Sequence, residues 1–284
     1  MKKYLPRFII ILCALYLIIC VGFYLAQESL IFNPRKHALD YSIPIVGEYE
    51  EMFIEMDDGI SLNGLLLKAD STRGLVFYLH GNRGSIYRRM EQNDLYRQAG
   101  YDVFLLDYRG YGKSGGEIEN EERLHKDVEA AYAYIADRYA EHTIVVLGYS
   151  LGTAFAARVS ASHNPALLVL LAPYSSMVDM KDLYYPFVPT PLIKYPLRTY
   201  DYLEKCSMPV VIFHGEEDDL IPLDMARQLS EAFKPTDTLI TLSNQGHRRV
   251  SYNALYKKVV KNMLDSLNAD YRLTTPDFSH SESF

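Results

Sequence analysis

The five residues Gly148-Tyr149-Ser150-Leu151-Gly152 decide how this sequence of 284 residues folds. They follow an apolar run, Ile144 to Leu147, that has the length of a buried β-strand, and they open an alanine-rich stretch, Leu151 to Ser162, that favours a helix. A serine on a sharp strand-to-helix turn projects its hydroxyl beyond the edge of a sheet, and flanking glycines allow a close backbone approach. The pattern therefore predicts a chemically usable Ser150 at the end of a strand.

Short apolar runs with the length of buried strands recur on both sides of this turn: Leu75–Leu79, Val103–Leu106, Leu167–Leu171, Val210–Phe213 and Thr238–Leu242. A β-hairpin precedes them, formed by Tyr49 to Glu55 and Ile60 to Leu67. Helical patterns lie between several runs, for example from Glu121 to Tyr139, and the last one covers Ser251 to Leu267. This alternation predicts an α/β fold whose mostly parallel sheet has helices on both faces.

The composition excludes several classes of protein. Apolar residues make up 49% and charged residues 23%, as in an ordinary globular chain. The net charge of −7 argues against a nucleic-acid partner, because such proteins neutralise phosphates with an excess of Lys and Arg. Of the three cysteines, only Cys206 lies outside the first apolar run, so neither an intradomain disulfide nor a zinc–cysteine site is expected.

The amino end carries a hydrophobic segment. Phe8 to Ala26 are 19 consecutive uncharged residues, which span about 28 Å as a helix and can cross a bilayer. A cleaved secretory signal is the alternative, but the run is long for one and has the bulky Tyr24 where a small residue is preferred. An uncleaved membrane anchor is the expectation.

The charges next to this segment predict its orientation. Lys2, Lys3 and Arg7 precede it, whereas the near flank beyond it carries Glu28. The positive-inside tendency then favours a cytoplasmic amino terminus and a catalytic body on the exported side.

Serine is a weak nucleophile unless a base takes its proton and an acid orients that base. Of eight histidines, only His247 lies in a loop between the last predicted strand and the last helix. The acid should follow the preceding strand, where Glu216, Glu217, Asp218 and Asp219 stand in a row, and the pattern alone leaves the choice open.

A fourth loop, His80-Gly81-Asn82-Arg83-Gly84, follows the strand that ends at Leu79. In such a fold it supplies one N–H group to a developing oxyanion, and the residue after the serine supplies the other. This assigns the donors to Asn82 and Leu151.

The chain resembles the serine α/β-hydrolases, and within them the membrane-anchored branch of Bem46-like and abhydrolase-domain proteins. The resemblance extends from Gln27 to the last helix, and four further motifs carry it together with the serine turn: His80-Gly81-Asn82, Asp107 to Ser114, Ala172-Pro173-Tyr174 and His214-Gly215…Asp218…Pro222. It implies a triad of Ser150, His247 and Asp218, the last chosen by the spacing of its loop, and a chemistry that needs neither metal nor organic cofactor.

The expected organisation has three parts. Residues 1–35 form the anchor, 36–270 the hydrolase domain with a short aromatic cap at about 174–206, and 271–284 a polar tail. Because all the chemical elements lie beyond residue 79, the body is expected to work on short esters without the helix.

The resemblance implies hydrolysis of a carboxylic ester or thioester through an acyl-enzyme, with lipids among the candidate substrates. The aromatic cap suits an acyl chain, but it is equally well explained as simple packing of a lid. Two alternatives stay open: an aminopeptidase of the same fold, with Glu216, Glu217 or Asp219 holding the substrate's amino group, and a catalytically silent binding or scaffold protein.

Overall fold

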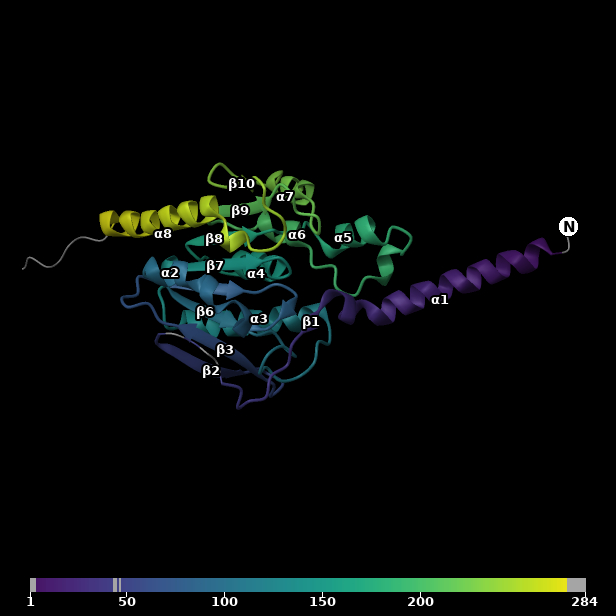
Figure 1. Ribbon diagram of the computed structural model, residues 1–284, viewed down its shortest axis with the longest axis horizontal. Coiled ribbons are helices and arrows are strands. Elements are labelled where there is room, and N and C mark those ends of the chain that lie inside the picture. The colour runs from purple at the N-terminus through teal and green to yellow at the C-terminus, as the bar shows by residue number, and fades with distance from the viewer. Residues whose placement is uncertain (1–3, 43–44, 46, 275–284) are drawn as a thin grey trace, which may run out of the picture.

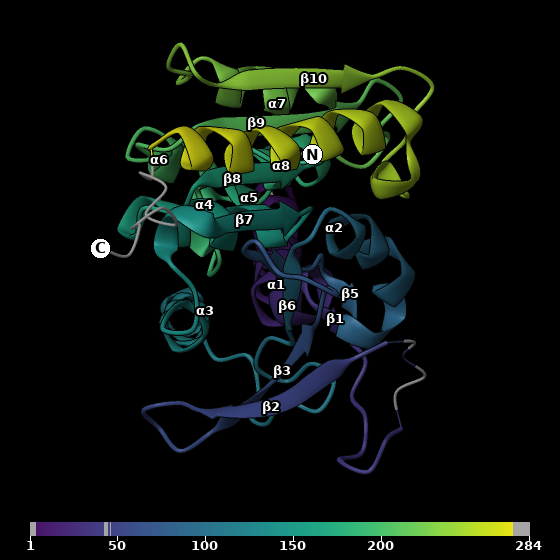
Figure 2. The same cartoon turned by 90° about the vertical axis from the view of Figure 1, so that its left-hand side faces the viewer.

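An eight-stranded sheet forms the centre of the computed structural model, which describes residues 4–42, 45 and 47–274. Its strand order is β10-β9-β8-β7-β4-β6-β3-β2, as Figure 2 shows from top to bottom. The strands are β2 Tyr49–Glu55, β3 Ser61–Leu67, β4 Leu75–Leu79, β6 Asp102–Leu106, β7 Ile144–Tyr149, β8 Leu167–Leu171, β9 Val210–Gly215 and β10 Thr238–Leu242. The β2–β3 and β3–β6 pairs are antiparallel and the others are parallel. The expected mostly parallel sheet is confirmed.

Helices cover both faces of the sheet because its central strands are apolar on both sides. Every residue of β4, β7 and β8 is buried. One face packs on α3 Glu121–Ala136, α4 Gly152–Ser162, α6 Thr199–Leu203 and α7 Leu223–Ser230, and the other on α2 Asp94–Gln98 and α8 Ala254–Thr274. An apolar core lies on each face of the sheet, because the sheet is buried between these two layers of helices. The last helix continues beyond the expected start of the tail at residue 271, and residues 275–284 lie outside the described part.

The first helix, α1 Leu5–Ile31, projects from the body (Figure 1). Within the described residues it is the one helix long and apolar enough to cross a bilayer, and few of its residues are buried. It extends beyond the uncharged run Phe8 to Ala26 at both ends, and its last turns lie against the body. The short strand β1 Asn33–Pro34 follows and pairs with β5 Arg83–Gly84.

The cap lies between β8 and β9, as the position of the aromatic stretch predicts. It consists of α5 Met177–Tyr184, the 3₁₀ turn η3 Thr190–Leu192 and α6, joined by irregular segments. Three prolines at 186, 189 and 191 interrupt regular helix here because they lack the N–H that a helix interior needs. Elsewhere in the described residues, 3₁₀ turns are η1 Ile86–Asn93, η2 Glu141–Thr143 and η4 Val250–Tyr252.

Candidate active site

Ser150 occupies the turn between β7 and α4 with φ of 51°, in the left-handed region. Such a conformation is costly for a residue with a side chain and is held here by its surroundings. The Ser150 N–H donates to the Leu171 carbonyl at 2.9 Å. Gly152 is required because a Cβ there would lie 2.2 Å from the Leu79 carbonyl oxygen. Close packing of the turn against β4 and β8 thus fixes the serine at the carboxyl edge of the sheet.

His247 lies beside this serine. Its Nε2 is 3.1 Å from Ser150 Oγ, a distance at which the hydroxyl donates to the ring. The histidine stands in the loop between β10 and η4, and its backbone carbonyl accepts a hydrogen bond of 2.9 Å from the Tyr149 hydroxyl. The rings of Tyr149 and His247 also stack, with centroids 5.7 Å apart. These contacts hold the imidazole over the serine.

Asp218 completes a chain of hydrogen bonds. His247 Nδ1 donates to its Oδ2 at 2.8 Å, while its Oδ1 accepts from the backbone N–H groups of Leu220 at 3.0 Å and Ile221 at 2.8 Å. The Asp218 side chain is fully buried, at 0% exposure. Its neighbours Glu216, Glu217 and Asp219 are exposed. Of the four acids in this loop, the structure brings Asp218 to the histidine.

His214 is a member of this cluster that the sequence analysis missed. It is the penultimate residue of β9, four residues before Asp218. Its Nε2 donates to the Ile221 carbonyl at 2.7 Å and lies 3.4 Å from Asp218 Oδ2. Burial lowers its pKa, which favours the neutral ring. The sequence motif His214-Gly215 marked this position, but the local sequence does not indicate that the His214 side chain packs under the loop that carries Asp218.

The two expected oxyanion donors lie next to Ser150. Asn82 and Leu151 both line the same cavity as the serine, and among the described residues neither backbone N–H makes a hydrogen bond. Leu151 is the N-cap residue directly before α4, so its N–H lies at the positive end of the helix dipole. The Asn82 carbonyl accepts from the Asn33 N–H at 2.9 Å and from the Tyr111 hydroxyl at 2.8 Å, which fixes the loop.

The loop after β6, from Asp107 to Ser114, supports this edge of the sheet. Asp107 is buried, accepts a hydrogen bond of 2.9 Å from the Ile86 N–H and lies 3.5 Å from His80 Nε2. Burial raises the pKa of its carboxyl group, and His80 opposes that rise. Arg109 makes two hydrogen bonds to Asp127, of 2.8 and 3.0 Å. These partners give the motif a structural role in holding the His80–Asn82 loop.

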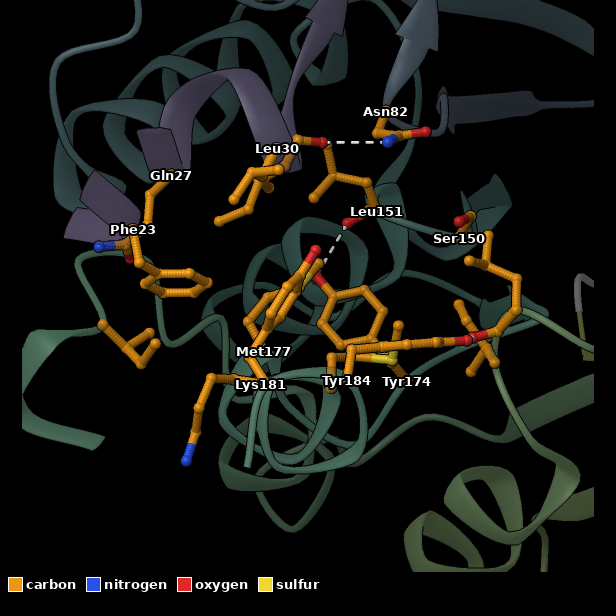
Figure 3. A pocket seen from close by; sticks show the side chains of 16 residues that line it. Phe23, Gln27, Leu30, Asn82, Ser150, Leu151, Tyr174, Met177, Lys181 and Tyr184 are labelled. Atoms are coloured by element: carbon orange, nitrogen blue, oxygen red, sulfur yellow. Dashed lines mark hydrogen bonds between the residues drawn. The ribbon is translucent and has the colours of Figure 1, made fainter. Parts of the chain in front are cut away.

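A cavity of about 300 Å³ opens at Ser150, at the lower end of the range for small-molecule sites (Figure 3). Its lining is mostly apolar and contains no acidic residue among the described ones: Phe23, Gln27, Leu30, Ile31, Asn82, Ser150, Leu151, Tyr174, Met177, Met180, Lys181, Tyr184, Tyr185, Ile193, Leu220 and Ile221. Figure 3 shows Phe23, Gln27 and Leu30 of α1 on the side opposite Ser150. No group of three His, Cys, Asp or Glu side chains in the described chain could hold a metal ion.

The end of α1 is therefore part of the cavity wall, which differs from the expected separation of anchor and body. Asn82 Nδ2 donates to the Ile31 carbonyl at 3.0 Å, so the helix end also touches the oxyanion loop. Local patterns could not predict this contact because it joins segments 51 residues apart.

Known proteins are similar to this chain over most of its length. The sequence profile of the family described as "Serine aminopeptidase, S33" matches residues 70–198. An uncharacterised protein of Mycobacterium tuberculosis is 27% identical over 228 residues, 78% of this chain and 80% of that protein. Alpha/beta hydrolase domain-containing protein WAV2 of Arabidopsis thaliana is 29% identical over 223 residues, 69% of this chain and 72% of that protein. Protein bem46 of Schizosaccharomyces pombe is 28% identical over 187 residues, 62% of each.

The fold has solved counterparts. The esterase Pf2001 of Pyrococcus furiosus superposes with a TM-score of 0.66 at 20% identity, over 85% of this chain and 98% of that one. Est1E of Butyrivibrio proteoclasticus gives a TM-score of 0.63 at 20% identity, over 77% and 99%. The solved structures show that the chain has the α/β-hydrolase fold. The profile match and the relatives support placing it with the Bem46-like and abhydrolase-domain branch of these proteins.

Proposed function

We propose that this hydrolase cleaves carboxylic ester or thioester bonds with Ser150, His247 and Asp218 as its catalytic triad. His247 Nε2 takes the proton of Ser150 Oγ as the oxygen attacks the carbonyl carbon, and then gives it to the leaving alcohol or thiol. Water, deprotonated by the same nitrogen, releases the acyl group from the serine. Asp218 keeps the Nδ1–H tautomer of His247, so that Nε2 is free to accept. The observation that carries the proposal is the continuous Ser150–His247–Asp218 hydrogen-bond chain at the cavity.

The N–H groups of Asn82 and Leu151 are the proposed donors to the tetrahedral oxyanion. Neither backbone group has a hydrogen-bond partner in the part of the chain that the structure describes, and both residues line the cavity with Ser150. Removing one such donor in other hydrolases costs about 10²- to 10³-fold in kcat.

An acyl chain is the substrate group that fits the cavity best. The walls carry Phe, Tyr, Leu, Ile and Met side chains, whose burial against an alkyl chain gains about 25 cal/mol per Å². The cationic end of Lys181 points away from the centre of the cavity and pairs with Asp182 outside it (Figure 3).

An aminopeptidase is the second candidate, favoured by the description of the matching family. It needs an anionic group for the substrate's α-amino group, and none of the described residues lining this cavity is acidic. Glu216 and Glu217 are exposed outside it, and Asp219 borders a separate surface hollow. The ester reading is therefore preferred.

We also propose that α1 anchors the enzyme in a membrane, amino terminus cytoplasmic and catalytic body on the exported side. The support is the 19-residue uncharged run within α1 and the basic residues before it. Full-length protein should resist alkaline carbonate extraction, and protease outside sealed spheroplasts should digest the body. Protection of the body until lysis would reverse the orientation.

The reaction is tested with matched substrates on full-length protein in detergent. p-Nitrophenyl esters of increasing acyl length, an acyl thioester and an aminoacyl p-nitroanilide are compared, with Ser150→Ala as the control. We expect ester and thioester turnover that rises with acyl length and disappears in the variant. Faster hydrolysis of the anilide would favour the aminopeptidase, and absence of all turnover the silent scaffold.

A further inference from the structure

One face of α1 packs along the cap. Its members are spaced by three or four residues, as a helix face requires: Tyr16, Cys20, Phe23, Gln27 and Ile31. Cys20 and Gln27 are buried. In Figure 1, α5 and the loop after it lie beside the body-proximal half of α1. The cap and the candidate membrane span therefore share a contact that begins at the body and runs outward along the helix.

Polar groups mark the end of this contact nearest the body. Gln27 Nε2 donates to the Leu192 carbonyl and its Oε1 accepts from the Lys194 N–H, both at 2.8 Å. The Lys194 ammonium lies 3.0 Å from a Glu28 carboxylate oxygen and 4.3 Å from the centre of the Tyr24 ring. A charged pair and an aromatic ring of this kind are typical of the membrane–water interface.

The other end of the contact lies much further along the helix. The rings of Phe23 and Tyr185 have centroids 5.1 Å apart, and the Tyr16 hydroxyl donates to the Phe187 carbonyl at 2.8 Å. Eleven residues separate Tyr16 from Gln27, a rise of about 16 Å. That is half of the roughly 30 Å hydrocarbon thickness of a bilayer. If the uncharged run of α1 spans the membrane, Phe187 cannot remain in water.

The cap segment at this depth has the composition of a membrane-embedded surface. Residues 183–193, here called the cap edge, read Leu-Tyr-Tyr-Pro-Phe-Val-Pro-Thr-Pro-Leu-Ile and carry no charge, between Asp182 and Lys194. Its large side chains are exposed: Leu183 by 47%, Tyr184 by 44%, Tyr185 by 37% and Phe187 by 53%. An exposed apolar cluster of this kind marks an interaction surface.

Most backbone N–H groups of the cap edge have partners within the protein. Its three prolines have no N–H to satisfy, and the N–H groups of Tyr185, Val188, Leu192 and Ile193 donate to carbonyls within the cap. Those of Phe187 and Thr190 have no acceptor among the described residues. Irregular backbone at membrane depth is tolerated only when its polar groups find partners in the protein.

We propose that the cap edge is immersed in the membrane leaflet together with α1, and that the active-site cavity takes its acyl chain directly from that leaflet. The cavity wall unites the two elements, because Phe23 and Leu30 of α1 line it together with Tyr184, Tyr185 and Ile193 of the cap edge. A chain lying in the leaflet beside α1 reaches Ser150 without crossing water. The proposal rests on the membrane anchoring and acyl hydrolysis proposed above.

The chain contains no tryptophan, so a single introduced one reports its own surroundings. Phe187→Trp probes the cap edge, and Tyr134→Trp is the matched control. Tyr134 is 47% exposed and lies near the end of α3. The chain runs from there to the amino end of β7, whereas Ser150 lies at the carboxyl end of that strand. Full-length protein is reconstituted in phosphatidylcholine vesicles, with or without bromine atoms on the acyl chains. We expect blue-shifted emission and loss of most fluorescence to brominated lipid for Phe187→Trp, and neither effect for the control.

Two other measurements distinguish this proposal from the proposed membrane anchoring and the proposed catalytic activity. Carbonate extraction tests whether α1 is inserted, and fluorophosphonate labelling tests the active serine. Water-exposed emission at Phe187→Trp in protein that is inserted and labelled would overturn the immersed cap edge and leave the proposed function intact. Blue-shifted emission that brominated lipid does not quench would overturn it as well, because a second protein surface would then cover the cap edge.

A charge in the cap edge tests the consequence for catalysis. Phe187 does not line the cavity, so Phe187→Glu should hydrolyse short, water-soluble esters at the unchanged rate. We expect it to lose most of its activity on long-chain esters held in vesicles, whereas Tyr134→Glu keeps both activities. Equal activity of the two variants on vesicle-bound ester would contradict entry of the substrate from the leaflet.

Discussion

The neighbouring acids Asp218 and Asp219 offer a matched pair of substitutions, each to Asn. Asp218 Oδ1 accepts from the N–H groups of Leu220 and Ile221, while Oδ2 accepts from His247 Nδ1. In Asp218→Asn the amide oxygen must stay toward the two backbone donors, because an NH₂ group there would face them donor to donor. The new NH₂ group then faces His247 Nδ1.

That orientation changes the tautomer of the histidine. With a donor opposite Nδ1, the ring carries its proton on Nε2, and Nε2 can no longer accept the proton of Ser150 Oγ. A carboxylate-to-amide change with this effect costs about 10⁴-fold in kcat in other triads. This corresponds to about 5.4 kcal/mol of transition-state stabilisation, at 1.36 kcal/mol for each factor of ten. The Asp219 side chain is exposed, and within the described part of the chain His247 pairs with Asp218 instead, so Asp219→Asn should leave kcat within about twofold.

The assay measures kcat and KM on a short p-nitrophenyl ester, with thermal unfolding as the check that both variants are folded. We expect KM to change little in either variant, since Asp218 does not touch the substrate cavity. A folded Asp218→Asn enzyme within tenfold of the wild type would refute the role of this carboxylate. A larger loss in Asp219→Asn would show that the acid loop supplies the other residue.

Three further changes test the site. Ser150→Ala and His247→Ala should each lower kcat by about 10⁴- to 10⁶-fold, and the double variant should be scarcely worse; additive losses would contradict a single catalytic unit. Gly152→Ala places a Cβ 2.2 Å from the Leu79 carbonyl oxygen and should destabilise the folded protein by about 3 kcal/mol or more. Gly22→Ala is the control, because its Cβ would have no neighbour within 4 Å, and thermal unfolding in detergent compares the two variants. Burial lowers the pKa of His214, so the unfolded chain takes up a proton at a higher pH than the folded protein does. The free energy of unfolding should therefore fall as the pH drops below about 6.5, by up to about 1.4 kcal/mol per pH unit. Urea unfolding of His214→Gln should show a weaker dependence of this free energy on pH, and an unchanged dependence would exclude His214 as its source.

The sheet and the serine turn could be predicted from sequence because they depend on local patterns. Runs of five residues coincide with β4, β8 and β10 at the predicted limits, and the Gly148–Gly152 pattern marks the turn itself. The choice of Asp218 needed more than periodicity, since four acids stand in a row. The loop spacing of the resembled family selected Asp218, and the structure places this carboxylate beside His247.

The contact between α1 and the cap could not be predicted, because hydrophobicity reports that a segment avoids water and not what it lies against. Gln27 is the clearest case: it is the first polar residue after the uncharged apolar run, and it is buried and hydrogen-bonded to Leu192 and Lys194. Its burial changes the expectation for a chain that begins near Pro34. Such a chain loses Phe23, Gln27 and Leu30 from the cavity wall, so we now expect weaker binding of long acyl chains, seen as a raised KM.

Covalent labelling is the most direct test of whether Ser150 is the nucleophile. Full-length protein is treated with a fluorophosphonate, and its adduct is located by mass spectrometry of the peptides, with Ser150→Ala treated in parallel. We expect one adduct per chain, on Ser150, and none in the variant. An unlabelled wild-type protein, or an adduct of equal yield in Ser150→Ala, would contradict it.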